Sequence, residues 1–154
     1  GEYVTKIVDV KSADERNYCL VDGGIHQVNY YGSNMAMRTP VIEYISVENK
    51  WKSKMTNNTE TEAVNEMKQM QEYMICGSLC TFADILARGV SLQSPEIGDC
   101  LVFENIGAYS VTEGSYLFLS HALPEIYIKQ QNGQIRKVRS AQESWLINSV
   151  DDQV

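Results

Sequence analysis

Positive charge is scarce in this sequence, and long apolar runs are missing from it. Lysine and arginine number 13 against 20 aspartate and glutamate residues, so the formal net charge is -7. A nucleic-acid backbone or an anionic membrane surface would repel such a chain, and no basic stripe offsets the repulsion. No apolar run reaches the length of a membrane span, and the N-terminus carries no charged segment followed by an apolar one. We therefore expect a cytoplasmic protein that binds neither nucleic acid nor a membrane.

Histidine and cysteine are too few and too scattered to indicate a metal site. The chain has 2 histidines and 4 cysteines. Cys76 and Cys80 form a C-x3-C pair, but no second cysteine or histidine pair stands at the spacing of a zinc finger. Three of the four cysteines lie in or beside apolar runs, where a reduced thiol packs as a small hydrophobic group. We expect no metal, and free thiols rather than disulfides.

The pattern of apolar residues predicts a mainly-β fold. The chain of 154 residues has no internal repeat and is of one-domain length. Alternating or apolar runs predict strands over 4–11, 16–21, 41–47, 115–119, 125–129 and 134–139, and two more strands in the stretch 73–109. Turn residues recur about every ten positions, with hairpin connections at 12–15 and at Asn132-Gly133. We predict an antiparallel, Greek-key-like β-barrel or sandwich with a few short helices.

Two segments outside these strands favour helices. Residues 48–71 are polar, contain the turn signal Asn57-Asn58-Thr59, and then resemble a short helix that begins at Thr61. We interpret 48–71 as an insertion, more typical of a solvated lid or packing helix than of a site. A second short helix is predicted over 142–150.

Three motifs follow one another in the stretch 73–109. They are Cys76-Gly77-Ser78-Leu79-Cys80-Thr81-Phe82-Ala83-Asp84, then Gly98-Asp99-Cys100-Leu101-Val102-Phe103, then Gly107-Ala108-Tyr109. In order and approximate spacing they resemble the G-P-x-C-x-S-x-D, G-D-x-L-x-F and G-A-Y motifs of the pyridoxal-phosphate decarboxylases that include diaminopimelate and ornithine decarboxylase. Three motifs in order are more specific than any one, since Gly-Asp before an apolar run is ordinary turn chemistry.

The resemblance implies a domain organisation and an activity. Residues 1–154 would be the C-terminal β-barrel domain of a fold-type III decarboxylase. In that family the N-terminal (β/α)8 barrel carries the cofactor lysine, the phosphate loop and the ring-nitrogen glutamate, and this sequence lacks that barrel. We therefore expect the isolated domain to be inactive, and to work with the barrel of the same parent chain in a homodimer. The implied substrate is an amino acid such as diaminopimelate, ornithine or lysine, in lysine or polyamine biosynthesis.

Cys80 and Tyr109 are the two residues that the resemblance assigns to the chemistry. Cys80 matches the family cysteine that, across the dimer interface, returns a proton to the α-carbon after CO2 has left, and a neutral thiol suits this task. The alternative is a buried structural cysteine like Cys19 or Cys100. Tyr109 matches the tyrosine that reaches the cofactor phosphate, to which a phenol can donate a hydrogen bond. The alternative is an aromatic side chain that packs at a strand end. In these roles Cys80 and Tyr109 form half of a pocket.

Two further residues of the first motif are candidates for substrate contact. Asp84 matches the family aspartate, and it could orient its turn, pair with a basic group of the partner subunit, or cap a helical turn over 85–88. Thr81 takes the place of an acidic family residue that binds the distal amine of the substrate. Threonine cannot balance a full positive charge, so this contact differs from the family pattern.

A loop after the first two predicted strands completes the candidate site. Asp22-Gly23-Gly24 resembles the D-G-G corner of the family, which precedes a loop that reaches ligand. Gln27 falls where diaminopimelate decarboxylases carry an arginine that holds a substrate carboxylate, so a neutral amide replaces a bidentate clamp. Tyr31, in the same loop, is either a ligand contact or a half-buried aromatic.

Two rival interpretations belong to other classes of protein. One is a non-catalytic regulatory homologue that keeps the barrel and has lost the cofactor lysine. The other is a β-sandwich interaction domain whose motifs match by accident. The second predicts a monomer without an aromatic or cysteine-lined face, whereas a decarboxylase domain predicts an exposed apolar patch where barrel and dimer partner dock.

Overall fold

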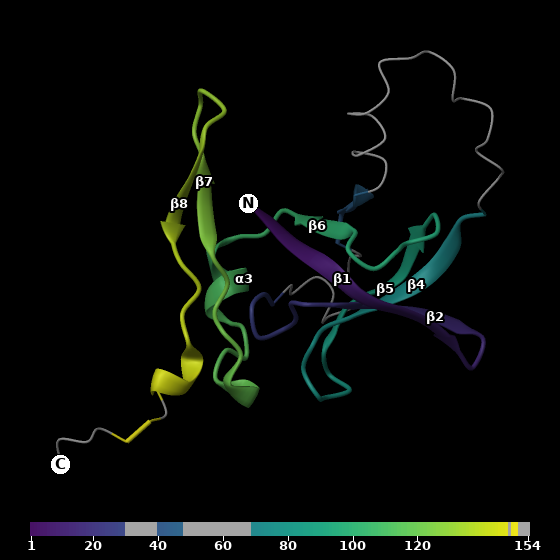
Figure 1. The fold of residues 1–154 in the computed structure, drawn as a ribbon, viewed down its shortest axis with the longest axis horizontal. Coiled ribbons are helices and arrows are strands. Elements are labelled where there is room, and N and C mark those ends of the chain that lie inside the picture. The colour runs from purple at the N-terminus through teal and green to yellow at the C-terminus, as the bar shows by residue number, and fades with distance from the viewer. Residues whose placement is uncertain (30–39, 48–68, 148, 151–154) are drawn as a thin grey trace.

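Six strands form one curled sheet and two more form a separate hairpin (Figure 1). The computed structural model describes residues 1–29, 40–47, 69–147 and 149–150. The sheet has the spatial order β3-β6-β1-β2-β4-β5 and consists of β1 (Glu2–Ala13), β2 (Arg16–Val21), β3 (Ile42–Ile45), β4 (Gln71–Cys76), β5 (Ile85–Leu92) and β6 (Cys100–Glu104). The hairpin joins β7 (Ile126–Lys129) to β8 (Ile135–Arg139). The described helical segments are α3 (Ala108–Thr112) and the 3-10 turns Phe118–Ser120 and Ser144–Ile147.

The mainly-β prediction is confirmed, with one pairing that departs from the antiparallel expectation. Strands β2 and β4 run parallel, from Asn17 opposite Tyr73 to Leu20 opposite Cys76. Parallel neighbours cannot be joined by a tight turn, and here the chain between them includes β3 on the far side of the sheet. The other pairs of the six-stranded sheet are antiparallel.

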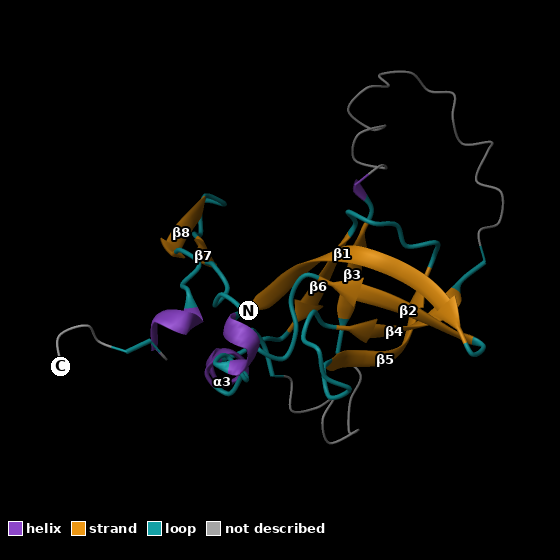
Figure 2. Cartoon of the chain, turned by 60° about the horizontal axis from the view of Figure 1, so that its bottom comes forward, coloured by secondary structure: helices purple, strands orange, loops and turns teal. Residues whose placement is uncertain are grey.

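Strand β1 gives the sheet its curl. Its first half alternates buried Tyr3, Thr5 and Ile7 with exposed neighbours, which is the period of a strand with one face on the core. This half pairs with β6, and the second half pairs with β2 after a register shift that begins at Ile7. A bulge bends a strand and increases its twist, so one long strand belongs to both parts of a half-barrel (Figure 2).

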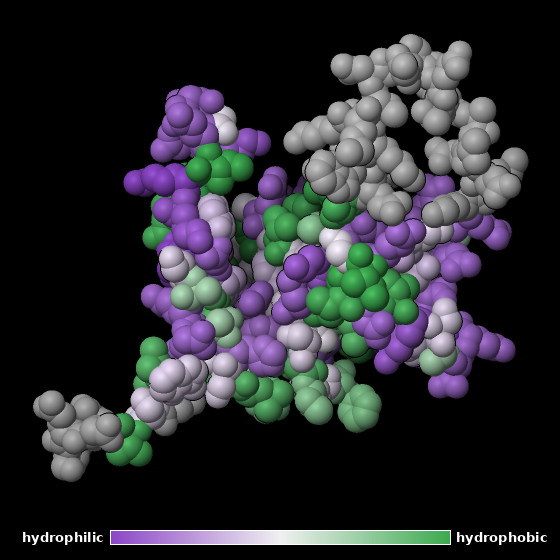
Figure 3. Space-filling view, viewed as in Figure 1, coloured by the Kyte–Doolittle hydropathy of each residue, from purple (hydrophilic) through white to green (hydrophobic). Residues whose placement is uncertain are grey.

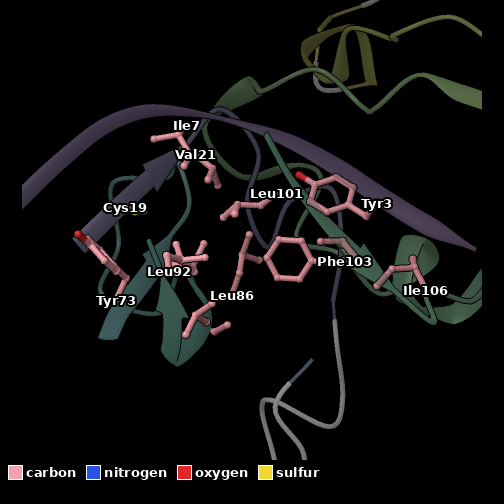
Figure 4. Close-up of a cluster of buried hydrophobic side chains, with 14 residues drawn as sticks. Tyr3, Ile7, Cys19, Val21, Tyr73, Leu86, Leu92, Leu101, Phe103 and Ile106 are labelled. Atoms are coloured by element: carbon pink, nitrogen blue, oxygen red, sulfur yellow. The ribbon is translucent and has the colours of Figure 1, made fainter. Parts of the chain in front are cut away.

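The core lies under β1, on the concave side of the sheet (Figure 4). Its fully buried members include Ile7, Ile75, Leu101 and Phe103. Each such side chain stabilises the fold by about 1.5–3 kcal/mol relative to an exposed one. Cys19 is buried with them, and burial raises the pKa of its thiol to about 12, as suits a structural cysteine. All four cysteines are free in the structure.

Three local predictions are wrong or incomplete. The segment 115–119 is not a strand, because Tyr116 to Leu119 are exposed and pair with no described strand, and the chain turns there through Leu119 at φ 60°. The turn 85–88 is not helical, because it opens β5. The helix predicted over 142–150 is reduced to the 3-10 turn Ser144–Ile147. The helix predicted within 48–71 lies outside the described residues but for its last positions.

The hairpin turn at Asn132-Gly133 is confirmed. Gly133 has φ +82°, a conformation that favours glycine, and it connects β7 to β8.

No described helix combines the length and the apolar character needed to cross a membrane.

Candidate functional site

The loop that carries Cys80 is held from below by a buried carboxylate. This loop, residues 77–84, is called the Cys80 loop. Asp84 at its end is 2% exposed. Its Oδ1 accepts the N–H of Ile25 at 2.8 Å, and its Oδ2 accepts the N–H of Leu79 at 2.8 Å. One side chain therefore joins the Cys80 loop to the turn after β2, residues 22–29, which we call the hub turn.

Two glycines make room for this carboxylate. A Cβ atom on Gly77 would lie 2.2 Å from Asp84 Oδ2, and a Cβ atom on Gly24 would lie 2.5 Å from the same oxygen. No side chain fits in either place. The glycines of the first motif and of the D-G-G corner are thus explained by close packing on Asp84.

Among the roles predicted for Asp84, the geometry supports orientation of the turn. The cap of a helical turn over 85–88 is wrong, because these residues begin β5. The carboxylate lies beneath the loop and both oxygens accept backbone N–H groups, so it does not face outward toward a ligand.

The outer surface of the Cys80 loop carries a thiol and an aromatic ring. Cys80 is exposed and Phe82 is fully exposed. Thr81 is half-buried, and its hydroxyl accepts the N–H of Ala83 at 3.3 Å. The thiol is therefore presented to its surroundings, which rules out the alternative of a buried structural cysteine.

Tyr109 stands on a second segment that is attached to the same hub turn. Residues 107–122, here called the Tyr109 segment, begin with α3. The carbonyl of Ser110 accepts the N–H of Asn29 at 2.6 Å, and the N–H of Ser115 donates to the carbonyl of Ile25 at 2.9 Å. The Tyr109 side chain is 77% exposed. The peptide groups of Ile25 thus bind the Cys80 loop through one atom and the Tyr109 segment through another.

Gln27 lies in the hub turn and is occupied by internal hydrogen bonds. The hydroxyl of Tyr3 donates to Gln27 Oε1 at 2.8 Å, and Gln27 Nε2 donates to the carbonyl of Ala122 at 3.4 Å. Burial raises the pKa of the Tyr3 phenol, so it remains a donor. The Gln27 amide therefore connects β1 to the Tyr109 segment, a role that the sequence pattern did not indicate for Tyr3 or Gln27.

Two histidines join the hub turn to the Tyr109 segment. The rings of His26 and His121 lie 4.7 Å apart between centroids. His26 is 1% exposed, and neither of its ring nitrogens has a hydrogen-bond partner among the residues that the structure describes. Burial, followed by the neighbouring His121, lowers the pKa of His26, so the ring is neutral at physiological pH. Their separation in the sequence concealed this contact.

Tyr31, the remaining predicted ligand contact, lies outside the described residues. Within the described parts of the chain, no group of three histidine, cysteine, aspartate or glutamate side chains is placed to hold a metal ion.

The comparisons with known proteins name the family. Residues 1–107 match the family model described as pyridoxal-dependent decarboxylase, C-terminal sheet domain. The chain belongs to this family. The match confirms the resemblance seen in the three motifs, and it excludes an unrelated sandwich with accidental motifs. An exposed phenol such as Tyr109, which makes no side-chain hydrogen bond within the described residues, fits the family cofactor as a donor to its phosphate.

Two relatives of known activity cover most of the chain. A 2-[(L-alanin-3-ylcarbamoyl)methyl]-2-hydroxybutanedioate decarboxylase from Staphylococcus aureus is 31% identical over 131 residues, which is 84% of this chain and 30% of the relative. An L-glutamyl-[BtrI acyl-carrier protein] decarboxylase from Niallia circulans is 28% identical over 140 residues, which is 89% of this chain and 29% of the relative. The chain thus spans less than a third of the length of either relative.

Solved structures show the same fold. A diaminopimelate decarboxylase superposes with a TM-score of 0.72 at 21% identity, over 95% of this chain and 32% of the other. The diaminopimelate decarboxylase of M. jannaschii, solved with L-lysine, gives a TM-score of 0.70 at 15% identity, over 97% of this chain and 30% of the other. The curled sheet is therefore the C-terminal sheet of this family.

Proposed function

We propose that this chain is the C-terminal domain of a pyridoxal-phosphate-dependent amino-acid decarboxylase, to which Cys80 and Tyr109 contribute active-site groups. The observation that carries the proposal is their placement: both side chains are exposed, and both segments that carry them are hydrogen-bonded to Ile25 of the hub turn. Family membership and two decarboxylases among the relatives support the reaction type.

Each residue has a separate task in this proposal. Pyridoxal phosphate, when bound, withdraws electrons from the α-carbon and so eases the loss of CO2. The Tyr109 phenol holds the phosphate by donating a hydrogen bond. The Cys80 thiol gives its proton to the α-carbon once CO2 has departed, and the sulfur, being exposed, regains a proton from solvent. Thr81 lies beside Cys80 on the surface that faces the substrate.

The domain works with partners in this proposal. The lysine and most phosphate contacts come from a (β/α)8 barrel in the same parent chain, and a homodimer brings Cys80 to its partner's site in the cytoplasm. Hydrophobic side chains gather over the Tyr109 segment, at the lower edge of the molecule in Figure 3. They include exposed Leu117, Phe118 and Leu119. An exposed apolar group of this kind supports a docking surface.

The substrate that we propose is an α-amino acid of the diaminopimelate, ornithine or lysine type, or a derivative of one. The structures with L-lysine support an amino acid of this length for the diaminopimelate enzymes. Gln27 supports a substrate or binding mode that differs from that of the diaminopimelate enzymes. Its side chain is neutral and bonded internally, so no charged group at this position can bind a second carboxylate.

Reconstitution tests the proposal. The chain is produced alone and together with its cofactor-binding barrel, and release of CO2 from ornithine, lysine, diaminopimelate and their acylated derivatives is measured. We expect release only when both parts are present. Release by the chain alone would contradict the division of roles, and a barrel without the cofactor lysine would indicate the non-catalytic regulatory homologue instead.

A further inference from the structure

The outer surface of the Cys80 loop is electrically neutral. Ser78, Cys80, Phe82 and Ala83 are exposed and Thr81 is half-buried, and none of these side chains carries a charge. The one acid of the loop, Asp84, is turned inward with both oxygens bound to backbone N–H groups. An ammonium group that leaves water needs a carboxylate partner, because burying it unpaired is costly. Among the residues that the structure describes, the surface beside the proposed proton donor offers none.

The hub turn does not supply the missing charge either. Its acid, Asp22, is engaged with β1, where its Oδ1 accepts the hydroxyl of Thr5 at 2.7 Å and the N–H of Lys6 at 2.9 Å. Gln27 is neutral and bonded internally. On the Tyr109 segment Glu113 is exposed at the end of α3, and it is the acid to be tested as a rival partner for an ammonium.

The ring of Phe82 makes the same surface favour an apolar part of a ligand. The ring is fully exposed two residues after Cys80. The turn that presents it is fixed, since the N–H of Thr81 donates to the carbonyl of Leu79 at 2.8 Å and the N–H of Asp84 donates to the carbonyl of Thr81 at 3.2 Å. When an apolar group of a ligand covers a ring that is held in water on a rigid turn, the burial stabilises the complex.

We propose that the substrate carries no free amino group at its distal end, and that its distal part is an uncharged group, such as an amide, which packs on Phe82. This inference rests on the proposed function and specifies its substrate class. Thr81, next to both Cys80 and Phe82, then determines specificity by being neutral.

Matched pairs of amino acids test the proposal in the holoenzyme, that is, this chain with its cofactor barrel. The pairs are ornithine with Nδ-acetylornithine and lysine with Nε-acetyllysine, and kcat/KM for CO2 release is measured. We expect the acetylated member to be favoured by about tenfold or more, the scale on which an unpaired polar group or a lost apolar contact discriminates. Phe82→Ala should raise KM for the acetylated compounds by a larger factor than KM for the free amines.

Variants at Thr81 separate charge from size. Thr81→Glu places a carboxylate on the neutral surface and should shift the preference toward the free amines. Thr81→Gln introduces a side chain of the same size as glutamate but without the charge, and it should not shift the preference. A preference of the wild type for free amines would overturn the inference. If Glu113→Gln then abolished that preference, Glu113 would be the group that binds the ammonium.

A second readout does not depend on turnover. In the holoenzyme, iodoacetamide labelling of Cys80 should be slowed more by the acetylated member of each pair than by the free amine. Equal protection by both would overturn the inference. Absence of CO2 release from every compound, with selective protection retained, would overturn the proposed function and leave the ligand class supported.

Discussion

At the scale of single residues, the carboxylate of Asp84 determines where the thiol of Cys80 stands. Each of its oxygens accepts one backbone N–H, from Ile25 and from Leu79. In Asp84→Asn one oxygen becomes an NH2 group that faces an N–H, which leaves a buried donor unsatisfied at a cost of about 1–3 kcal/mol. We expect lower stability in urea and a changed rate of Cys80 alkylation.

Asp99 provides a matched control for this prediction. It is 3% exposed and accepts hydrogen bonds from the hydroxyl of Tyr44 and from the N–H groups of Val47 and Glu96, none of which belongs to the Cys80 loop. Asp99→Asn should lose a similar amount of stability and leave the alkylation rate as it was. If both variants change that rate equally, Asp84 acts only through global stability.

His26 predicts a pH dependence of stability. Burial, with a smaller contribution from His121, lowers the pKa of His26 in the folded state. In the unfolded state the ring binds a proton at higher pH, so the unfolded chain takes up more protons on acidification. The stabilising contribution is therefore complete above the unfolded pKa of about 6.5 and is lost as the pH falls below it.

His26→Phe removes this titration while it keeps a ring of similar size. We expect urea unfolding at about pH 7.5 and about pH 5.5 to show a larger loss for the wild type than for the variant, in the window that the unfolded pKa sets. The same loss in both proteins would show that His26 is not the group responsible.

At the scale of elements, the Cys80 loop depends on glycines that admit the Asp84 carboxylate. In Gly77→Ala the new Cβ would lie 2.2 Å from Asp84 Oδ2, so the carboxylate must move. Overpacking of this kind typically costs about 1–3 kcal/mol. Gly107 is the control, because it has φ -106° and no described atom lies within 4 Å of its Cβ position. Thermal unfolding should show a loss for Gly77→Ala and little change for Gly107→Ala.

The strands were predictable from the sequence where alternation reflects a sheet face, as in β1 with Tyr3, Thr5 and Ile7 inside. The same rule failed over 115–119, because an apolar run does not show whether its side chains pack within the domain or against another protein surface. These side chains are exposed in the described structure, which is the expected state of a surface that docks elsewhere. Tyr109 was expected at a strand end and instead lies in α3.

The candidate site was predictable only as far as motifs reach. The motifs led to Cys80 and Tyr109, and the structure presents both side chains to the outside. Sequence spacing could not show that Asp84 turns inward or that Gln27 binds Tyr3 and Ala122, because both depend on contacts between segments far apart in the chain.

At the scale of the whole molecule, the hairpin β7–β8 stands apart from the six-stranded sheet. A two-stranded hairpin is marginal alone, and Ile128, Ile135 and Val138 on it are exposed. These side chains and the exposed apolar residues of the Tyr109 segment are available for the assembly proposed above. The chain spans less than a third of the length of the two relatives. The proposed partner corresponds to the rest of their length.

The most direct test of the account compares Cys80→Ser and Tyr109→Phe with Cys100→Ser in the reconstituted holoenzyme. Cys80→Ser should lower kcat for CO2 release by about 10²–10⁴-fold, the range for loss of a proton-transfer group, with cofactor affinity retained. Tyr109→Phe should weaken cofactor binding by about tenfold, as expected for one lost hydrogen bond to a charged group. Cys100→Ser should match the wild type. Wild-type kcat in Cys80→Ser, together with wild-type cofactor affinity in Tyr109→Phe, would contradict the claim that Cys80 and Tyr109 contribute active-site groups.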